Sequence, residues 1–310
     1  MKLKKFIALL SMTAMIGCLA VGCGSSDSDA DASAEGEDQV EEEAADWDPS
    51  SDITIVSRED GSGTRGAFIE LFGIEEKDES GEKIDMTTEE AQITNSTSVM
   101  MTTVAGDDYA IGYISLGSLD DSVKALKIDG AEATAENIKS GEYKVSRPFN
   151  IATKEGNDNA VAQDFIAYIM SEEGQQVVAD NGYIPLDDVE AYAGSAPEGK
   201  AVVGGSSSVS PVMEKLIEAY KEVNPNAEIE LQTTDSTTGM TSTIDGSYDI
   251  GMASRELKDT ELSEGLVPQV IATDGIAVIV NKNNTTDELS SDQVKTIYTG
   301  GALTWDEVVE

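Results

Sequence analysis

Residues 53–73 read ITIVSREDGSGTRGAFIELFG. The stretch begins with an apolar, β-branched run, continues through a loop of glycine and hydroxyl residues, and ends in a segment that can form a helix. The loop contains Arg58 and leads into a helix start, whose unpaired N–H groups carry partial positive charge. A planar guanidinium can hold a tetrahedral oxyanion through two parallel N–H bonds. The stretch therefore predicts one unit of an α/β fold with an anion-binding loop.

Two features of this loop narrow its role. The GSGT segment at residues 61–64 lacks the Gly-Lys-Ser/Thr ending of a Walker motif, so we do not expect a nucleoside triphosphate site. Asp60 lies two residues after Arg58, and we expect its carboxylate to orient the guanidinium by a hydrogen bond. The alternative is an Arg–Asp pair on the surface, which contributes little to stability.

Strands and helices alternate along the rest of the chain, which predicts an α/β fold. One helix is expected to end at Asn181 and Gly182, which together form a stop signal. Apolar runs typical of strands occupy residues 53–56, 110–116, 149–153, 201–205, 227–232, 248–253 and 275–280, and helical periodicity is clearest at residues 159–182, 211–223 and 290–298.

Three further junctions share the chemistry of the first loop. They are TNSTSVM (94–100), GGSSSVSP (204–211) and TDSTTGM (234–240). Each junction taken alone is explained by N-capping, because serine and threonine cap helices in most folds. Four such loops in one acidic chain favour a shared site, in which helix starts and hydroxyl groups hold an anion without requiring many charged side chains.

The composition excludes several classes of site. The chain has 310 residues, with 60 acidic and 20 basic side chains, a formal net charge of −40 and no histidine. The absence of histidine removes most zinc sites and histidine-dependent nucleophiles, and both cysteines, Cys18 and Cys23, lie too close to the N-terminus for a disulfide framework. The acidic surplus argues against a nucleic-acid partner. We therefore expect no metal, no cofactor and no nucleic acid.

Catalytic chemistry is also not expected. Ser62 and Ser207 have neither a histidine nor a Ser-x-x-Lys arrangement to activate them. A pair of carboxylates for glycoside hydrolysis would need a cleft for sugars, and an aromatic content of 5% is poor for stacking sugar rings. We predict a binding protein and not an enzyme.

The N-terminal segment is typical of an exported protein. Residues 1–22 combine early lysines with an apolar run, and the LAVGCGSS ending resembles the cleavage box of bacterial lipoproteins. Cys23 is then expected to be the lipidated first residue of the mature chain; the alternative is an ordinary secretory signal. Residues 23–52 are acidic and poor in apolar residues, which predicts a disordered tether.

Several long stretches resemble the phosphate-binding proteins of bacterial ABC transporters, in the type II periplasmic-binding-protein superfamily. The resemblance extends over residues 53–310 and implies an α/β fold of two lobes, with a central ligand cleft and two crossover hinge segments at 146–153 and 274–281. The stretches that carry it are SREDGSGTR (57–65), AIGYISLGSL (110–119), SEEGQQVVADNGYIPL (171–186), GGSSSVSPVMEKLIEAY (204–220), DIGMASREL (249–257), DGIAVIVNKNN (274–284) and IYTGGALTWDEV (297–308).

The order of these stretches differs from that of the family. The stretch like AVVGGSSSVSP opens the family's domain, whereas here it begins at residue 201. We therefore predict a circular permutation, with the old ends joined through residues 191–203 and the new ends close together; the alternative is a chain cut from a tandem gene. One lobe would comprise residues 53–147 and 282–310, and the other residues 148–281.

The resemblance also implies a set of ligand-binding residues. One position departs from the family: some members have an aspartate that accepts the proton of hydrogen phosphate where this chain has Ser254, which leaves discrimination against sulfate open. The next residue, Arg255, is expected either to supply a second cation or to pair with Glu256. The implied phosphate ligands are Arg58, Ser62, Gly63, Thr64, Ser207, Ser208, Ser236 and the departing Ser254, with Asp60 in support.

These features together predict a monomeric solute-binding protein on the extracytoplasmic face of the bacterial cell membrane. Anchored there by a lipid on Cys23, it would capture inorganic phosphate and deliver it to the permease subunits of an ABC transporter. The alternatives are a receptor for another anion, such as sulfate, molybdate or an organic acid, and a surface or sensory module that binds without transport.

Overall fold

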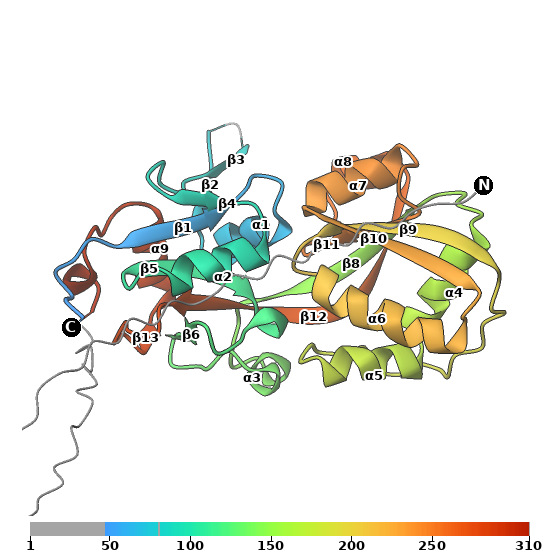
Figure 1. Cartoon of the computed structure of the whole chain (residues 1–310). Coiled ribbons are helices and arrows are strands. Elements are labelled where there is room, and N and C mark those ends of the chain that lie inside the picture. Colours follow the sequence, from blue (N-terminus) through green and yellow to red (C-terminus); the bar gives the residue numbers. More distant parts are fainter. Residues whose placement is uncertain (1–46, 80, 310) are drawn as a thin grey trace, which may run out of the picture. The chain divides into compact units, whose positions relative to one another are not determined.

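The main sheet of the protein follows one continuous path of paired strands. The structure, a computed structural model, describes residues 47–79 and 81–309 (Figure 1). Strands near both ends of the path pair in parallel, whereas β8 and β12 pair antiparallel with each other at its centre. The order is β10 (Ala227–Thr234), β9 (Gly199–Ser206), β11 (Ile250–Ala253), β8 (Ser146–Lys154), β12 (Leu266–Val280), β5 (Ala110–Ser115), β1 (Thr54–Arg58) and β4 (Gln92–Thr94), with β6 (Lys124–Ala125) paired to β12.

Helices follow the carboxyl ends of four parallel strands, as the predicted α/β fold requires. They are α1 (Gly63–Leu71) after β1, α2 (Thr97–Ala105) after β4, α6 (Ser210–Val223) after β9 and α7 (Ser236–Ile244) after β10. The remaining elements are β2 (Glu75–Lys77), β3 (Lys83–Asp85), η1 (Leu116–Ser118), β7 (Lys127–Ile128), α3 (Ala135–Ser140), α4 (Ala160–Ile169), α5 (Glu172–Asp180), α8 (Asp259–Ser263), β13 (Glu288–Leu289), α9 (Ser291–Tyr298) and η2 (Trp305–Glu307).

The segment predicted as one helix over residues 159–182 forms two helices, α4 and α5. The break falls at Ser171, whose side chain accepts a hydrogen bond from Gly174 N and caps α5. A Cβ on Gly174 would lie 2.1 Å from the carbonyl oxygen of Tyr168, so the close turn between the helices requires glycine. The predicted stop at Asn181 is confirmed, because α5 ends there.

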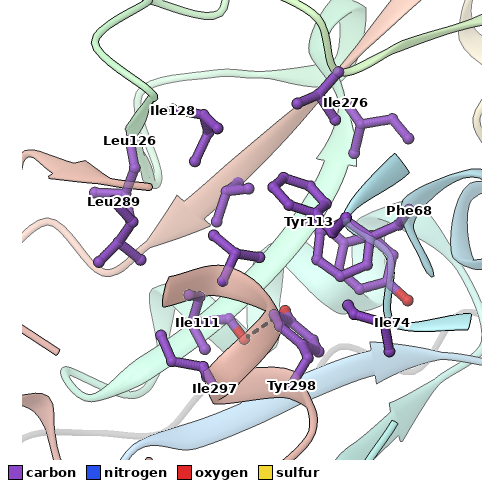
Figure 2. Close-up of a cluster of buried hydrophobic side chains, with 14 of the residues drawn as sticks. Phe68, Ile74, Ile111, Tyr113, Leu126, Ile128, Ile276, Leu289, Ile297 and Tyr298 are labelled. Atoms are coloured by element: carbon purple, nitrogen blue, oxygen red, sulfur yellow. Dashed lines mark hydrogen bonds between the residues drawn. The ribbon is translucent and has the colours of Figure 1, made fainter. Parts of the chain in front are cut away.

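Two large groups of buried apolar side chains both include residues of strand β12. Figure 2 shows part of the first group, in which the Phe68 ring stacks on that of Tyr113 with centroids 3.9 Å apart. The second group surrounds Phe149 and Phe165. Strand β12 contributes Ile271 to the second group and residues 276, 278 and 280 to the first, so this one strand links both cores.

The first and last described segments of the chain lie side by side. Ile53 N donates to Leu303 O at 2.8 Å, and Asp52 and Thr304 form an isolated bridge. The Trp47 ring packs edge-on against Trp305, with centroids 5.8 Å apart. Residues 47–52, predicted as the end of the tether, therefore contact the folded body.

The predicted signal segment 1–22, Cys23 and the tether as far as residue 46 lie outside the described residues. Within the described ranges, no helix has both the length and the apolar character needed to cross a membrane.

Candidate functional site

Three of the four predicted hydroxyl-rich loops meet at one place. Thr64, in the first turn of α1, has its Oγ1 2.8 Å from Ser208 Oγ, in the loop that precedes α6. The first residue of α2, Thr97, lies 3.2 Å from Ser208 Oγ and 3.4 Å from Ser207 Oγ, measured from its own Oγ1. The starts of α1, α2 and α6 therefore converge, and their hydroxyl groups form one buried cluster.

The fourth loop joins through Ser236 at the start of α7. Ser254 N donates to Ser236 Oγ at 3.1 Å, and Ser206 Oγ donates to Ser254 Oγ at 2.9 Å. Ser254 Oγ also lies 3.5 Å from Thr64 Oγ1. We call this set the hydroxyl cluster; its members are Thr64, Thr97, Ser206, Ser207, Ser208, Ser236 and Ser254.

Gly63 allows the start of α1 to approach the other helix starts. A Cβ built on this residue would lie 2.4 Å from Ser236 Oγ and 2.8 Å from Ser254 Oγ. Any side chain here would therefore displace two members of the hydroxyl cluster. The preceding residue, Ser62, is buried and caps α1 by accepting a hydrogen bond from Arg65 N at 3.3 Å.

Arg58 lies at the carboxyl end of β1 and is only 1% exposed. Its Nη2 donates to Ser207 Oγ at 3.1 Å, which places the guanidinium at the edge of the hydroxyl cluster. Its Nη1 is buried and has no hydrogen-bond partner among residues 47–79 and 81–309. A buried cation with a spare donor, close to hydroxyl groups and helix starts, suits a small oxyanion.

Glu59, and not Asp60, orients Arg58, so the predicted role of Asp60 is wrong. The Glu59 carboxylate accepts two hydrogen bonds of 2.8 Å, from Nε and Nη2 of Arg58. The Asp60 side chain is 98% exposed and instead accepts from Arg65 Nη1 at 3.0 Å. Arg65, in α1, also donates from its Nη1 to the Arg58 carbonyl oxygen at 2.7 Å, and this contact holds the Arg65 guanidinium beside Asp60.

Neither predicted use of Arg255 describes its main contact. Its Nη2 and Nη1 bind the Glu261 carboxylate at 2.7 and 2.9 Å, whereas its contact with Glu256 is to the backbone oxygen. Burial would raise the pKa of Glu261, but hydrogen bonds from Arg255 and from the backbone of Lys258 lower that pKa overall. The predicted pair with the Glu256 side chain is thus replaced by an ion pair with Glu261.

Several residues near the site were missed by sequence reasoning. Thr97 belongs to the hydroxyl-rich stretch 94–100, so the composition of that stretch could have identified it as a candidate ligand. Glu59 could not be separated from Asp60 by spacing alone. Arg147 and Asp274 form a buried ion pair of 3.0 Å between β8 and β12, and no local motif indicates it.

The described part of the chain contains no group of three or more acidic, cysteine or histidine side chains able to hold a metal ion. What the site offers is a guanidinium, hydroxyl groups and helix N-termini. These groups bind an anion by hydrogen bonds and partial charge, and the hydroxyl groups can both donate and accept.

Comparisons with known proteins place the chain in a well-defined group. A family model described as a PBP superfamily domain matches residues 32–173 and 190–309. The phosphate-binding protein PstS 2 of Streptococcus agalactiae serotype V is 62% identical over 256 residues, which cover 83% of this chain and 87% of that protein. The phosphate-binding protein PstS of Bacillus subtilis strain 168 is 35% identical over 140 residues, 44% of this chain and 43% of that protein.

A solved structure is similar in both fold and sequence. It is the crystal structure of a phosphate-binding protein of a phosphate ABC transporter from Streptococcus pneumoniae TIGR4. The two chains are 45% identical, with a TM-score of 0.66, and the match covers 84% of this chain and 100% of the other. The fold is therefore shared over most of the described residues.

Proposed function

Since the chain belongs to the family of phosphate-binding proteins of ABC transporters, within the PBP superfamily, we propose that it binds inorganic phosphate between Arg58 and the hydroxyl cluster. This is a family of binding proteins for transport and not of enzymes. The observation that carries the proposal is the buried Arg58 guanidinium, which keeps its Nη1 free of partners among the described residues while its Nη2 contacts Ser207.

Each predicted ligand residue except Ser254 has a role in this proposal. Arg58 supplies the full positive charge, and Glu59 holds its guanidinium in place. Hydroxyl groups of Thr64, Ser207, Ser208 and Ser236, with Thr97 in addition, donate to the phosphate oxygens. The backbone of Gly63 lies at the start of α1, where the helix N-terminus favours an anion, whereas Ser62 N donates to Glu59 O at 2.9 Å and Ser62 contributes by capping the helix.

We further propose that two lobes close over the ligand. One lobe would comprise residues 53–147 and 282–310, and the other residues 148–281. The hydrogen bonds from Arg58 to Ser207 and between Thr64 and Ser208 would join the two lobes, so closure would assemble the donors. The two apolar groups support this division except at residues 276, 278 and 280, which it assigns to the second lobe although they pack in the first group.

The setting of the protein is also part of the proposal. It would stand as a monomer on the extracytoplasmic face of the bacterial cell membrane, held by a lipid on Cys23, and pass phosphate to the permease subunits of its transporter. The N-terminal sequence supports export and lipidation. The Streptococcus pneumoniae protein, described as part of a phosphate ABC transporter, supports the permease as partner.

The order of the chain supports a circular permutation. In a permuted domain, a collinear alignment with an unpermuted relative captures about half of either chain, as the alignment with the Bacillus subtilis protein does. The long alignment with the Streptococcus agalactiae protein would then mean that this relative shares the order found here. The pairing of residues 51–53 with 303–305 supports this proposal, because a permuted domain requires its new ends to lie close together.

Ser254 favours a second candidate, a receptor for sulfate or another oxyanion. Its hydroxyl group stands within the hydroxyl cluster where a carboxylate would repel an anion that carries no proton. A hydroxyl group can accept a hydrogen bond from hydrogen phosphate but can also donate one to sulfate, so it does not exclude sulfate by charge.

Isothermal titration calorimetry of the purified full-length chain tests these proposals. We expect tight binding of phosphate that an equal concentration of sulfate does not displace, and loss of binding in Arg58→Ala with an unchanged far-ultraviolet circular dichroism spectrum. Binding of sulfate but not phosphate would replace the first candidate with the second. Absence of binding to phosphate, sulfate and molybdate would instead favour a surface or sensory module.

A further inference from the structure

We propose that Arg147 is a second positive charge of the anion site, held by Asp274 where β8 and β12 run side by side, and that it increases the affinity of the site for doubly charged anions. The inference rests on the proposed function, because it assigns a further specificity-determining residue to the same site. Neither residue belongs to the predicted ligand set.

The position of Arg147 follows from strand register. Arg147 and Asp274 are paired across β8 and β12, and their side chains are 2% and 1% exposed. Asp274 Oδ2 accepts from Arg147 Nη2 at 3.0 Å, and its Oδ1 accepts from Ser115 Oγ at 2.9 Å. Ser115 is the last residue of β5, so the ion pair lies at the carboxyl end of that strand.

Arg58 lies at the same edge of the sheet. Strands β1 and β5 are parallel neighbours, with Ile55 paired to Ile111, so the carboxyl ends of both strands lie together. Arg58 N also donates to the hydroxyl of Tyr113, in β5, at 3.2 Å. Arg58 therefore lies at the end of β1, and Arg147 lies in β8, with β5 and β12 between these two strands in the sheet.

Both arginines keep unused donors. Nε and Nη1 of Arg147 are buried without a hydrogen-bond partner in the described ranges, as is Nη1 of Arg58. A carboxylate can accept two parallel bonds from one guanidinium, yet Asp274 takes only one from Arg147. Buried donors of a charged group are costly to leave unpaired, so this arrangement favours an additional acceptor.

The electrostatics link the two arginines. Burial lowers the pKa of Arg147, Asp274 opposes this change, and the nearby positive charge of Arg58 lowers the pKa further. An anion bound at Arg58 would therefore also interact with the charge of Arg147. Arg147 also lines a cavity of about 580 Å³ together with Gly66 and Ala67 of α1, and neither Arg58 nor a member of the hydroxyl cluster lines this cavity.

Two charge roles follow for the pair, and they have opposite signs. Arg147 attracts the anion, and the negative charge of Asp274 weakens that attraction while keeping Arg147 in place. A pair that served only to hold β8 against β12 would behave differently, because loss of either partner would disturb the hinge in the same way. The sign of the change in affinity therefore separates the two roles.

The test measures phosphate affinity by calorimetry at pH 8 in full-length wild-type protein, Arg147→Gln and Asp274→Asn, at low and high salt. We expect Arg147→Gln to weaken binding roughly tenfold or more, as loss of a charge in a partly shielded site predicts. Asp274→Asn keeps an acceptor for Arg147 and should tighten binding severalfold. Lys215→Gln, which removes an exposed positive charge from α6, is the matched control and should change affinity less than twofold.

Shifts in the same direction for both hinge variants, or a change of less than twofold in Arg147→Gln, would overturn the inference while leaving the proposed function intact. If Arg147→Gln does not fold by circular dichroism, Arg147→Lys and Asp274→Asn decide: the former should retain affinity within about threefold, and the latter should still bind more tightly. A wild-type chain that binds neither phosphate nor sulfate would overturn the proposed function, and the inference with it.

Discussion

The Oγ1 atom of Thr64 lies 2.8 Å from the Oγ atom of Ser208, although the two residues are 144 positions apart in the chain. This contact brings the start of α1 against the loop before α6. Closely spaced helix starts are possible here because the residues between them are small, and Gly63 is the smallest of these.

Gly63→Ala should weaken phosphate binding about ten- to hundredfold, because overpacking at this position costs about 1–3 kcal/mol. The added Cβ would lie 2.4 Å from Ser236 Oγ and would force the loops apart. Calorimetry measures the loss. Gly66→Ala, on the same helix, is the control, since its Cβ would meet only Arg255 Cδ at 4.0 Å. Equal affinities of the two variants would contradict the assigned approach of α1.

Glu59→Ala should weaken phosphate binding roughly tenfold, because the Arg58 guanidinium loses the two charge-assisted hydrogen bonds that orient it. Loss of the negative charge of Glu59 would by itself strengthen the binding of an anion. A weaker phosphate affinity would therefore show that Glu59 acts by orienting the Arg58 guanidinium. Asp60→Ala removes the same charge one residue later, from an exposed side chain, and should leave affinity within twofold. A larger effect in Asp60→Ala than in Glu59→Ala would restore the role that the sequence suggested for Asp60.

The stability of the protein should depend on pH through Asp274. Burial raises the pKa of this carboxyl group to about 6, although Arg147 opposes the change. The folded state therefore binds a proton more tightly than the unfolded state, in which the pKa is about 3.9. The resulting stabilisation is fully present below pH ~4 and is lost as the pH rises through 6, a change of about 3 kcal/mol.

Urea unfolding of wild-type protein and Asp274→Asn between pH 4 and pH 8 measures this effect. Since asparagine does not titrate, the free energy of unfolding of the variant should rise relative to wild type as the pH increases from 4 to 7. A difference that stays constant over this range would show that Asp274 titrates normally in the folded protein.

Asp164→Ala should lower the free energy of unfolding by about 3 kcal/mol while leaving phosphate affinity unchanged. The Asp164 carboxylate, in α4, accepts hydrogen bonds from Tyr192 Oη, Tyr220 Oη and Ser195 N. The bonds from Tyr192 and Ser195 hold the segment between α5 and β9 against α4. Burial would raise the pKa of Asp164, but these hydrogen bonds lower it overall. Denaturant unfolding measures the loss, and a cost below about 1 kcal/mol would show that the segment is held by other contacts.

The regular parts of this fold could be predicted from sequence because their signals are local. A β-branched run followed by small hydroxyl residues and an apolar helix marks the segments around Arg58 and Ser207. The break at Ser171 was missed because the apolar periodicity continues through it, whereas the turn depends on the close approach of Gly174 to a carbonyl group.

The candidate site was only partly predictable for a related reason. Hydroxyl-rich loops can be recognised one at a time, but the choice between Glu59 and Asp60 depends on where α1 places Arg65. The Arg147–Asp274 pair joins residues 127 positions apart, through the register of two long strands. Neither residue stands in a pattern that distinguishes it from a surface charge.

The hydrogen bond from Ile53 N to Leu303 O brings the first and last described segments together, so the path of the backbone is nearly a closed loop. A short glycine linker between the paired ends would make this loop covalent, and a cut in the irregular segment 194–198 would then open it elsewhere without removing any strand from the sheet. One body could thus be encoded by genes with different starting points, and its strand pairs would not depend on the order of its motifs along the sequence.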